Sequence, residues 1–511
     1  MAEAYGYRPP AITGLVDVLD RQVREHPHAL ALVATADRIP VTYGALAAMV
    51  DGVATHLKEM GLQPADPVAL VCPNQTEFVV GLLGAARAGL VIAPMDPALP
   101  GPELSERLEE VGARAVLACA TTVPHVDGPV WTLRVDVAGT VTLDTGEPLA
   151  RRVRGAGHEL TGEDALVLFT AGTTDRAKLV PLTHTNVAAS VRGICAGYEL
   201  GPDDATVAAM PFFHGHGLFA VLLSTLATGG SVLLPARGRF SAHTFWDDVE
   251  DAAATWFTAV PTIYEILVSR AAHDFPRAGS APLRFVRSCS APLNAATHQA
   301  VERVLGVPLL SAYGMTETTH QTASEPLPER GPHKHGSVGR ATGVALRLLD
   351  QNGLAVPAGA EGEVWVGGPT VAREYLSNPI ETAHSFAGGW FRTGDLGRLD
   401  DDGYLFLTGR LKNLINRGGE KIAPEHVEDV LAGCPGVVEA AVFAVPDAVY
   451  GERVGAAVVV AGNTGAGEIL RYCRTRLAAF EVPDRVDIVP ALPHTAKGAI
   501  DRRALDARYA R

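Results

Sequence analysis

A short loop rich in hydroxyl side chains follows an apolar run and ends in a lysine. It reads Leu168-Phe169-Thr170-Ala171-Gly172-Thr173-Thr174-Asp175-Arg176-Ala177-Lys178. Hydroxyls, backbone N–H groups and one lysine on a tight glycine-containing turn suit the phosphate chain of a nucleotide. The GxxxxGK[ST] spacing of a Walker loop is absent, so this loop alone indicates a phosphate site no better than a solvated turn. The candidate contacts are Thr170, Gly172, Thr173, Thr174 and Lys178.

Two later turns carry the carboxylates that a nucleotide site needs. Tyr313-Gly314-Met315-Thr316-Glu317 places a hydroxyl beside a carboxylate, which suits a phosphate contact and a Mg²⁺ ligand. Asp395, on a turn, can accept hydrogen bonds from two ribose hydroxyls, and Arg410 follows in the same order. Taken singly, Asp395 also fits a turn cap and Arg410 a surface charge. The order of the motifs along the chain is what favours a site.

Histidines and glycines mark two further positions. His214 and His216 stand in Pro211-Phe212-Phe213-His214-Gly215-His216-Gly217. An HxH pair is one part of a metal site, but no third ligand follows at a useful spacing, so zinc is not expected. The pair Gly418-Gly419 would let a ligand pass close to the backbone. Glu420 and Lys421 beside it also fit a solvated face.

The composition argues against several classes of partner. The 511 residues carry 43 basic against 57 acidic side chains, a formal net charge of −14, so neither nucleic acid nor an anionic membrane is an expected partner. The six cysteines show no CxxC pairing, and the first ten residues have no signal-peptide features, so we expect a cytoplasmic protein with reduced thiols. The apolar stretch 217–235 contains polar residues and a Gly229-Gly230 pair, which favours a buried helix followed by a strand over a membrane span.

Strands and helices alternate through most of the chain. Residues 41–94 predict a βαβ rhythm and hence a parallel sheet, and the pattern recurs between 164 and 310. From Gly339 onward, short strands such as 345–349 and 362–366 predict a small β-barrel or a distorted sheet. After Gly409 we expect a compact α+β unit of about one hundred residues.

Taken in order, these motifs resemble the acyl-CoA synthetases of the adenylate-forming superfamily, over essentially the whole chain. The central section resembles the oxalate–CoA ligase branch in four blocks: GRFSAHTFW (238–246), TWFTAVPT (255–262), RFVRSCSA (284–291) and GPHK (331–334). The resemblance implies an α/β fold with a large N-terminal AMP-binding domain over 1–409, made of α/β subdomains and the small β-barrel. A hinge over 410–413 and a small mobile α+β C-terminal domain over 414–511 would follow.

The resemblance also implies a role for each motif. The phosphate loop would hold ATP, Thr316 would contact the α-phosphate, and Glu317 would hold Mg²⁺ when ATP is used. Asp395 and Arg410 would bind the ribose, and Lys412 would be the hinge. Around the adenine would lie Ser290, Ala291, Pro292, Tyr313, Gly314 and Met315. The acyl pocket would comprise His214 beside the reacting carboxylate, Gly215, Gly217, Ser290 and Ala291. The contacts of coenzyme A would be Arg417, Gly418, Gly419 and Glu420.

Two departures from the family pattern bear on the chemistry. The closing motif, residues 492–502, has Ala499 where the family carries a lysine that draws ATP and the carboxylate together. A charged donor at a developing charge is typically worth about 10²–10³ in rate. Lys497 shares a face with position 499 in an extended segment, but it would have to reach about 6–7 Å along the strand. In the phosphate loop, Ala171 replaces a serine and Asp175 a glycine; one such charge facing a phosphate at about 5 Å repels it by roughly 3 kcal/mol.

The sequence therefore predicts an acyl-CoA ligase that forms the thioester and releases AMP, from a preformed acyl-adenylate and with little or no adenylating activity. A separate adenylating enzyme would supply the adenylate of a small-molecule carboxylic acid, and coenzyme A would accept the acyl group. Two alternatives stay open. One is a complete ATP-dependent synthetase with an engineered lysine-to-alanine change at 499, and the other is a silent adenylate-binding protein. The loop substitutions favour natural loss over engineering. The acyl group, and a carrier protein as thiol acceptor, also stay open.

Overall fold

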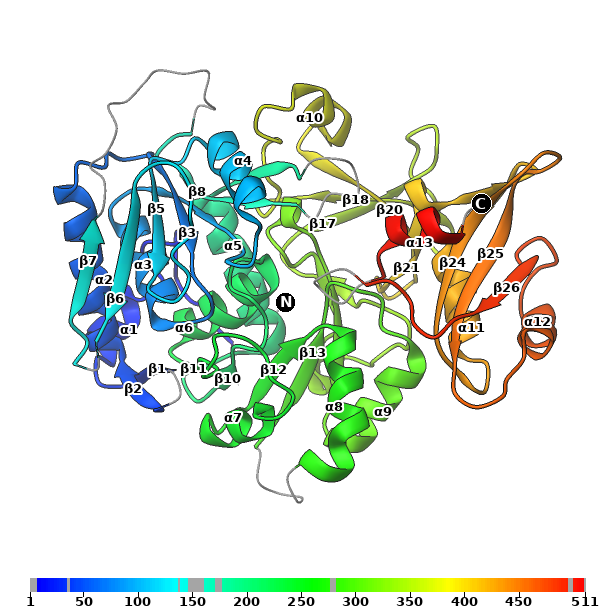
Figure 1. Ribbon diagram of the computed structural model, residues 1–511, viewed down its shortest axis with the longest axis horizontal. Helices are drawn as coiled ribbons and strands as arrows, with labels where there is room; N and C mark the ends of the chain where they lie inside the picture. The colour runs from blue at the N-terminus through cyan, green and yellow to red at the C-terminus, as the bar shows by residue number, and fades with distance from the viewer. Residues whose placement is uncertain are drawn as a thin grey trace.

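The computed structural model describes residues 7–34, 37–136, 138–145, 160–170, 177–275, 282–494 and 500–509. Figure 1 shows a large N-terminal unit, blue to yellow, beside a smaller C-terminal unit in orange and red. The mixed α/β fold with a large N-terminal and a small C-terminal domain is as predicted, while the exact domain boundaries stay a prediction. No described helix is both long enough and apolar enough to cross a membrane.

A seven-stranded sheet forms the centre of the N-terminal unit. Its order is β7-β6-β5-β3-β4-β8-β9, parallel from β6 to β8 and antiparallel at both edges. The inner strands are buried on both faces, which accounts for their nearly continuous apolar sequences. The bounds are β3 Pro67–Val71, β4 Val91–Pro94, β5 Ala115–Cys119, β6 Val130–Val135, β7 Val141–Thr145, β8 Asp164–Phe169 and β9 Leu179–Thr183.

Helices pack on both faces of this sheet. α2 (Tyr43–Glu59) begins after Thr42, whose hydroxyl accepts from the N–H of Ala45 and so satisfies a free first-turn donor. With α3 (Thr76–Arg87) and α5 (His184–Tyr198) it buries one face, while α4 (Gly101–Val111) covers the other. The predicted βαβ rhythm is confirmed.

A second sheet and a small mixed sheet complete the α/β part. The second sheet has the order β12-β13-β14-β15-β16 and is parallel over its first three strands, with α8 (Pro261–Asp274) and α9 (Ala295–Leu305) after β12 and β13. The predicted buried helix followed by a strand is a π-helix η2 (His216–Leu223), α6 (Ser224–Thr228) and β11 (Ser231–Leu233). Further bounds are β1 Leu30–Ala34, β2 Ile39–Thr42, β10 Ala205–Val207, β12 Trp256–Ala259, β13 Phe285–Ser288, β14 Leu309–Tyr313, β15 Ala323–Ser324 and β16 Arg340–Ala341.

The two sheets that follow are largely antiparallel. The first has the order β17-β18-β20-β19 with β21 on β20, and its register shifts twice, so it takes the form of the distorted sheet and not of a closed barrel. The C-terminal sheet, β23-β22-β25-β24 with β26 on β25, packs against α11 (Pro424–Ala432), α12 (Ala466–Arg474) and α13 (Arg502–Tyr509). The bounds are β17 Ala345–Leu349, β18 Glu361–Gly367, β19 Phe386–Ala387, β20 Trp390–Leu399, β21 Leu405–Arg410, β22 Ile415–Arg417, β23 Glu420–Ile422, β24 Val437–Asp447, β25 Gly451–Val460 and β26 Arg485–Ile488.

Candidate active site

The predicted site segments follow the carboxyl ends of β8, β13 and β14, which is where open α/β sheets place their ligands. Tyr313 ends β14, and its hydroxyl donates to Asp395 Oδ2 at 2.5 Å. Arg410 stands opposite Asp395 in the β20–β21 pairing and forms a 2.6 Å ion pair with Oδ1. Burial, and then the Asp395 carboxylate, raise the pKa of Tyr313 well above its usual range, so its hydroxyl stays a donor. The three predicted ribose and adenine contacts are therefore assembled from two sheets.

Tyr375 connects the residues that are predicted to contact the phosphates. The Lys178 ammonium forms an ion pair with Glu381 of α10 (Pro379–Ser385) and lies 4.6 Å from the centre of the Tyr375 ring. The Tyr375 hydroxyl donates to Glu317 Oε1 at 2.7 Å. Thr170 accepts from the backbone N–H of Lys178 at 3.1 Å. Lys178, Glu317 and Thr170, which the sequence places in separate motifs, thus belong to one connected group.

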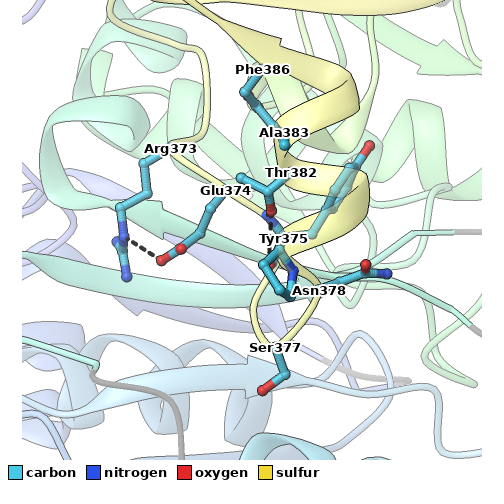
Figure 2. A pocket seen from close by; sticks show the side chains of 9 residues that line it. Arg373, Glu374, Tyr375, Ser377, Asn378, Thr382, Ala383 and Phe386 are labelled. Atoms are coloured by element: carbon cyan, nitrogen blue, oxygen red, sulfur yellow. Dashed lines mark hydrogen bonds and ion pairs between the residues drawn. The ribbon is translucent and has the colours of Figure 1, made fainter.

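A cavity of about 460 Å³ borders this group beside α10. Figure 2 shows its lining, in which Arg373 and Glu374 form an ion pair, and Tyr375 is among the lining residues. Tyr375 is the link between the cavity and Glu317. Among the residues that the structure describes, none of those predicted for the adenylate lines this cavity, which is formed by Arg373, Glu374, Tyr375, Ser377, Asn378, Pro379, Thr382, Ala383 and Phe386.

The turn after β14 is folded tightly on itself. A Cβ on Gly314 would lie 1.4 Å from the carbonyl oxygen of His320, so only glycine fits there. Met315 leads into the short 3₁₀ helix η3 (Thr316–Thr318), which begins with two of the predicted contacts, Thr316 and Glu317. The reversal places His320 against Gly314 and close to Gly215, a predicted acyl-pocket residue.

The loop that carries His214 is anchored from the first sheet. Asn74, after β3, donates to the carbonyls of Ala208 and Met210 at 3.0 and 2.8 Å and accepts from the N–H of Phe212 at 2.8 Å. His214 itself is half-buried, and its ring meets Phe213 edge-on at 4.6 Å. The anchored loop gives the predicted carboxylate contact a fixed backbone.

A fully buried arginine lies behind the predicted acyl pocket. Arg287, on β13, is 0% exposed. Two of its partners are His216, at 3.2 Å, and His320, at 3.1 Å, whose rings stack with centroids 5.2 Å apart. His216 Nδ1 lies 3.1 Å from the hydroxyl of Ser290. Sequence reasoning gave Arg287 and His320 no role. The sequence signal that could have pointed to Arg287 is a charged residue within a short strand. In the structure every residue of that strand, Phe285–Ser288, is buried.

The two glycines of the predicted acyl pocket, Gly215 and Gly217, have different surroundings. A Cβ on Gly215 would lie 3.3 Å from Phe219 Cδ2 and 3.4 Å from His320 Cβ, so this glycine borders both side chains, and its place in the acyl pocket stays a prediction. A Cβ on Gly217 would lie 2.2 Å from the carbonyl oxygen of Pro211, so at that position the glycine makes room for backbone and not for an acyl group. Ser290 and Pro292 are exposed and Ala291 is half-buried.

The predicted hinge and coenzyme A contacts lie in and beside the C-terminal unit. Lys412 belongs to η5 (Leu411–Asn413), and burial, then the charge of Arg410, lower its pKa. Gly418 and Gly419 turn between β22 and β23 with φ of 61° and 101°, and Glu420 opens β23 in an exposed position.

Two arginines flank an exposed ring beside this turn. The Arg417 and Arg453 guanidinium carbons lie 5.8 and 5.6 Å from the centre of the Tyr450 ring, which is 46% exposed. The Tyr450 carbonyl accepts from the N–H of Gly418 at 2.8 Å. Gly172, Thr173, Thr174, Lys497 and Ala499, together with Ala171 and Asp175, lie outside the described residues.

Known proteins match the chain along nearly its whole length. Residues 19–376 match the family described as AMP-binding enzyme, and residues 426–499 match the AMP-binding enzyme C-terminal domain. Oxalate–CoA ligase of Arabidopsis thaliana is 41% identical over 507 residues, covering 97% of this chain and 98% of that protein. Sulfoacetate–CoA ligase of Cupriavidus necator is 33% identical over 481 residues, with 91% and 92% covered. The crystal structure of ATP-bound MatB from Rhodopseudomonas palustris superposes with a TM-score of 0.85 at 30% identity, covering 98% of this chain and 99% of that one.

Proposed function

The chain belongs to the AMP-binding enzyme family, among its CoA ligases, and from this premise we propose that it makes an acyl-CoA thioester chiefly from a preformed acyl-adenylate. The observation that carries the proposal is Ala499, where the family has a lysine that serves the adenylation step. A family member that has lost this lysine while keeping its AMP contacts would retain the second half-reaction and depend on another enzyme for the first.

The thioester-forming half-reaction depends little on the lysine that is absent at position 499 or on the altered phosphate loop. In that step the thiol of coenzyme A attacks the acyl carbonyl, the carbonyl–phosphate oxygen bond breaks, and AMP leaves. Asp395 and Arg410 would hold the ribose, and Lys178 would face the departing phosphate. The β- and γ-phosphates, against which Asp175 would act, are absent from the acyl-adenylate.

The residues fit the groups that the proposal requires. Glu317 offers a carboxylate on the same tyrosine that the lysine of the phosphate loop contacts, and a carboxylate is what a hard Mg²⁺ ion bound to phosphates prefers. A Cβ on Gly419 would meet nothing within 4 Å, so a pantetheine arm could pass over that backbone. Mg²⁺ would neutralise phosphate charge if ATP is bound, and coenzyme A would supply the thiol.

The acyl group itself is proposed from the pocket. The positive charge of Arg287, buried behind two histidines and a serine, favours through its electrostatic field an acid with a second anionic group beside its reacting carboxylate. The names of the relatives that act on oxalate and sulfoacetate support this class. We expect the sulfamoyl-adenosine analogue of malonate to bind at least about tenfold more tightly than that of butyrate, as measured by titration calorimetry.

The direct test is a pair of assays on one preparation. One gives ATP, Mg²⁺, coenzyme A and a panel of acids, and the other gives coenzyme A and the matching acyl-adenylates without ATP. We expect thioester only from the adenylates. Thioester from ATP and acid at a similar rate would overturn the loss of adenylation, and thioester from neither would favour the silent binding protein.

The Ala499→Lys variant separates natural loss from an engineered change. If the lysine alone is missing, the variant should gain about 10²–10³ in pyrophosphate release from ATP and acid. We expect much less, because Ala171 and Asp175 also depart from the family loop. The variant Lys497→Ala controls for rescue by the neighbouring lysine.

A further inference from the structure

The guanidinium of Arg287 is a buried charge with uncharged partners. It donates to the Tyr198 hydroxyl at 2.7 Å, to Thr258 at 3.1 Å and to Gln321 at 3.0 Å. Its two remaining contacts among the described residues are the Nε2 atoms of His216 and His320. A buried charge is costly without compensation, so this arginine needs a reason beyond packing.

The hydrogen-bond donors of Arg287 determine which ring nitrogen of His216 and of His320 carries the proton. A guanidinium can only donate, so each Nε2 that it touches must carry a lone pair, and each neutral ring then holds its proton on Nδ1. Thr258 is compatible with this assignment, because it accepts from Arg287 and its hydroxyl can then donate to His216 Nε2, which lies 2.6 Å away. Burial, and then the Arg287 charge, lower the pKa of both histidines well below its usual range, so neither ring carries a positive charge at neutral pH.

The direction of hydrogen-bond donation that Arg287 sets extends through His216 to Ser290. The Nδ1–H of His216 donates to the Ser290 hydroxyl oxygen at 3.1 Å, which leaves the hydroxyl hydrogen free to point elsewhere. Ser290 is exposed, and its φ of +75° is a strained value for a residue with a side chain. Such strain persists where the surroundings hold it, often at functional sites. The series Arg287, His216, Ser290 therefore ends in a hydroxyl hydrogen that His216 does not use and that a ligand can accept.

We propose that Arg287 is a positioning residue that locks His216 and His320 as Nδ1-protonated neutral rings, so that Ser290 presents its hydroxyl hydrogen to an oxygen of the acyl group. This inference rests on the proposed function, because it assigns Ser290 to the acyl end of the adenylate. Arg287 acts through His216 and touches no reactant. The alternative is a purely structural role, in which Arg287 ties β13 to α5 through Tyr198 and to the loop after β14 through Gln321.

A double-mutant cycle separates the two roles. The variants are Arg287→Met, Ser290→Ala and the pair, and the readout is binding of the sulfamoyl-adenosine analogue of malonate by titration calorimetry. We expect each single change to weaken binding about 10–100-fold, as for a lost hydrogen bond to a charged group, and the pair to lose no more than either alone. Arg287→Lys should recover part of the loss, because it keeps the charge but cannot serve both histidines.

The histidine protons give a readout that a structural role would not move. Long-range proton–nitrogen NMR correlations on histidine-labelled protein should show two Nδ1-protonated rings, unchanged from pH 5 to 8 in the unaltered chain. The titratable or charged groups facing these rings are Arg287, each other, and His214 beside His216. In Arg287→Met we expect mixed tautomers and a new titration near pH 6, with adenylate binding that varies over the same range.

Additive losses in the cycle, or Nε2-protonated rings in the unaltered protein, would overturn the proposal. If Arg287→Met does not fold, Ser290→Ala and the NMR measurement still decide, since the exposed serine can be changed without touching the core. Failure of the proposed function looks different. In that case no adenylate yields a thioester, while the tautomers and the cycle, which need only binding, keep their expected values.

Discussion

At the scale of single residues, the predicted ribose contacts Asp395 and Arg410 allow the most direct test of the site. Asp395 holds Tyr313 and Arg410 with its two oxygens, and Asn at this position would turn an N–H toward one of these donors. We expect Asp395→Asn to raise the Kd for AMP about 10–100-fold, in titration calorimetry.

Its matched control is Asp401→Asn, an exposed position on the turn between β20 and β21. This change should leave the Kd for AMP within about twofold, as for a surface site away from the ligand. Equal affinity in both variants would mean that Asp395 only stabilises the hairpin and that the nucleotide lies elsewhere.

At the scale of elements, the β24–β25 hairpin presents the exposed Tyr450 ring between Arg417 and Arg453. An aromatic face between two cations suits the adenine and phosphates of coenzyme A. We expect Tyr450→Ala to raise the KM for coenzyme A about tenfold and to leave kcat at saturating coenzyme A unchanged. The control is Val438→Ala, 64% exposed near the start of β24, which should change neither constant. A lower kcat in Tyr450→Ala would instead indicate that the ring helps to place the C-terminal unit.

Another element-scale effect concerns the segment after β15. Glu325 is 2% exposed, accepts from the N–H groups of Ser311 and Lys334, and burial raises its pKa from 4.5 to about 7. A raised carboxyl pKa favours the fold where the group is protonated. Its contribution is therefore fully present below about pH 4.5 and is lost as the pH rises through 7, by about 3 kcal/mol.

The variant Glu325→Gln should lack this decline. Relative to the unaltered chain, its thermal midpoint should rise between pH 5 and pH 8, while the exposed Glu329→Gln should track the unaltered chain. A constant difference across this pH range would show that Glu325 does not titrate in the fold.

At the scale of the whole molecule, local sequence patterns predicted the elements well, while the expectation that the separate motifs form one site came from the family resemblance. The strand expected over 345–349 has those bounds, and the strand expected over 362–366 is Glu361–Gly367. The array around Arg287 was not predictable, because its partners Tyr198, Thr258 and His320 come from α5, β12 and the turn after β14. Only the packing of separate elements brings them together. The same holds for Lys178 and Glu381, which are far apart in the sequence.

The arrangement of the N-terminal and C-terminal units indicates which of the two half-reactions, adenylation or thioester formation, this conformation fits. His494, at the start of the closing segment, lies 2.6 Å from Glu439, and the charges of both act on Glu265 of α8. The glycine turn, by contrast, contacts Tyr450, and its neighbour Arg417 contacts Phe480 and Asp484, all within the C-terminal unit. His494 therefore lies near the N-terminal unit here. We propose that a rotation about the predicted hinge, residues 410–413, brings the glycine turn to the adenylate.

Fixing that hinge should stop the thioester step alone. Proline at Lys412 locks φ near −65° and disfavours the helical conformation of Leu411, so rotation through this segment should become costly. We expect Lys412→Pro to bind the sulfamoyl analogue as before and to form thioester about 100-fold more slowly, because the coenzyme A contacts stay out of reach of the carbonyl. Lys412→Ala loses the side chain but keeps the rotation, and it should remain active. If Lys412→Ala loses as much as the proline variant, then the ammonium, which lies in the field of Arg410 and Asp395, takes part in the chemistry and the hinge lies elsewhere.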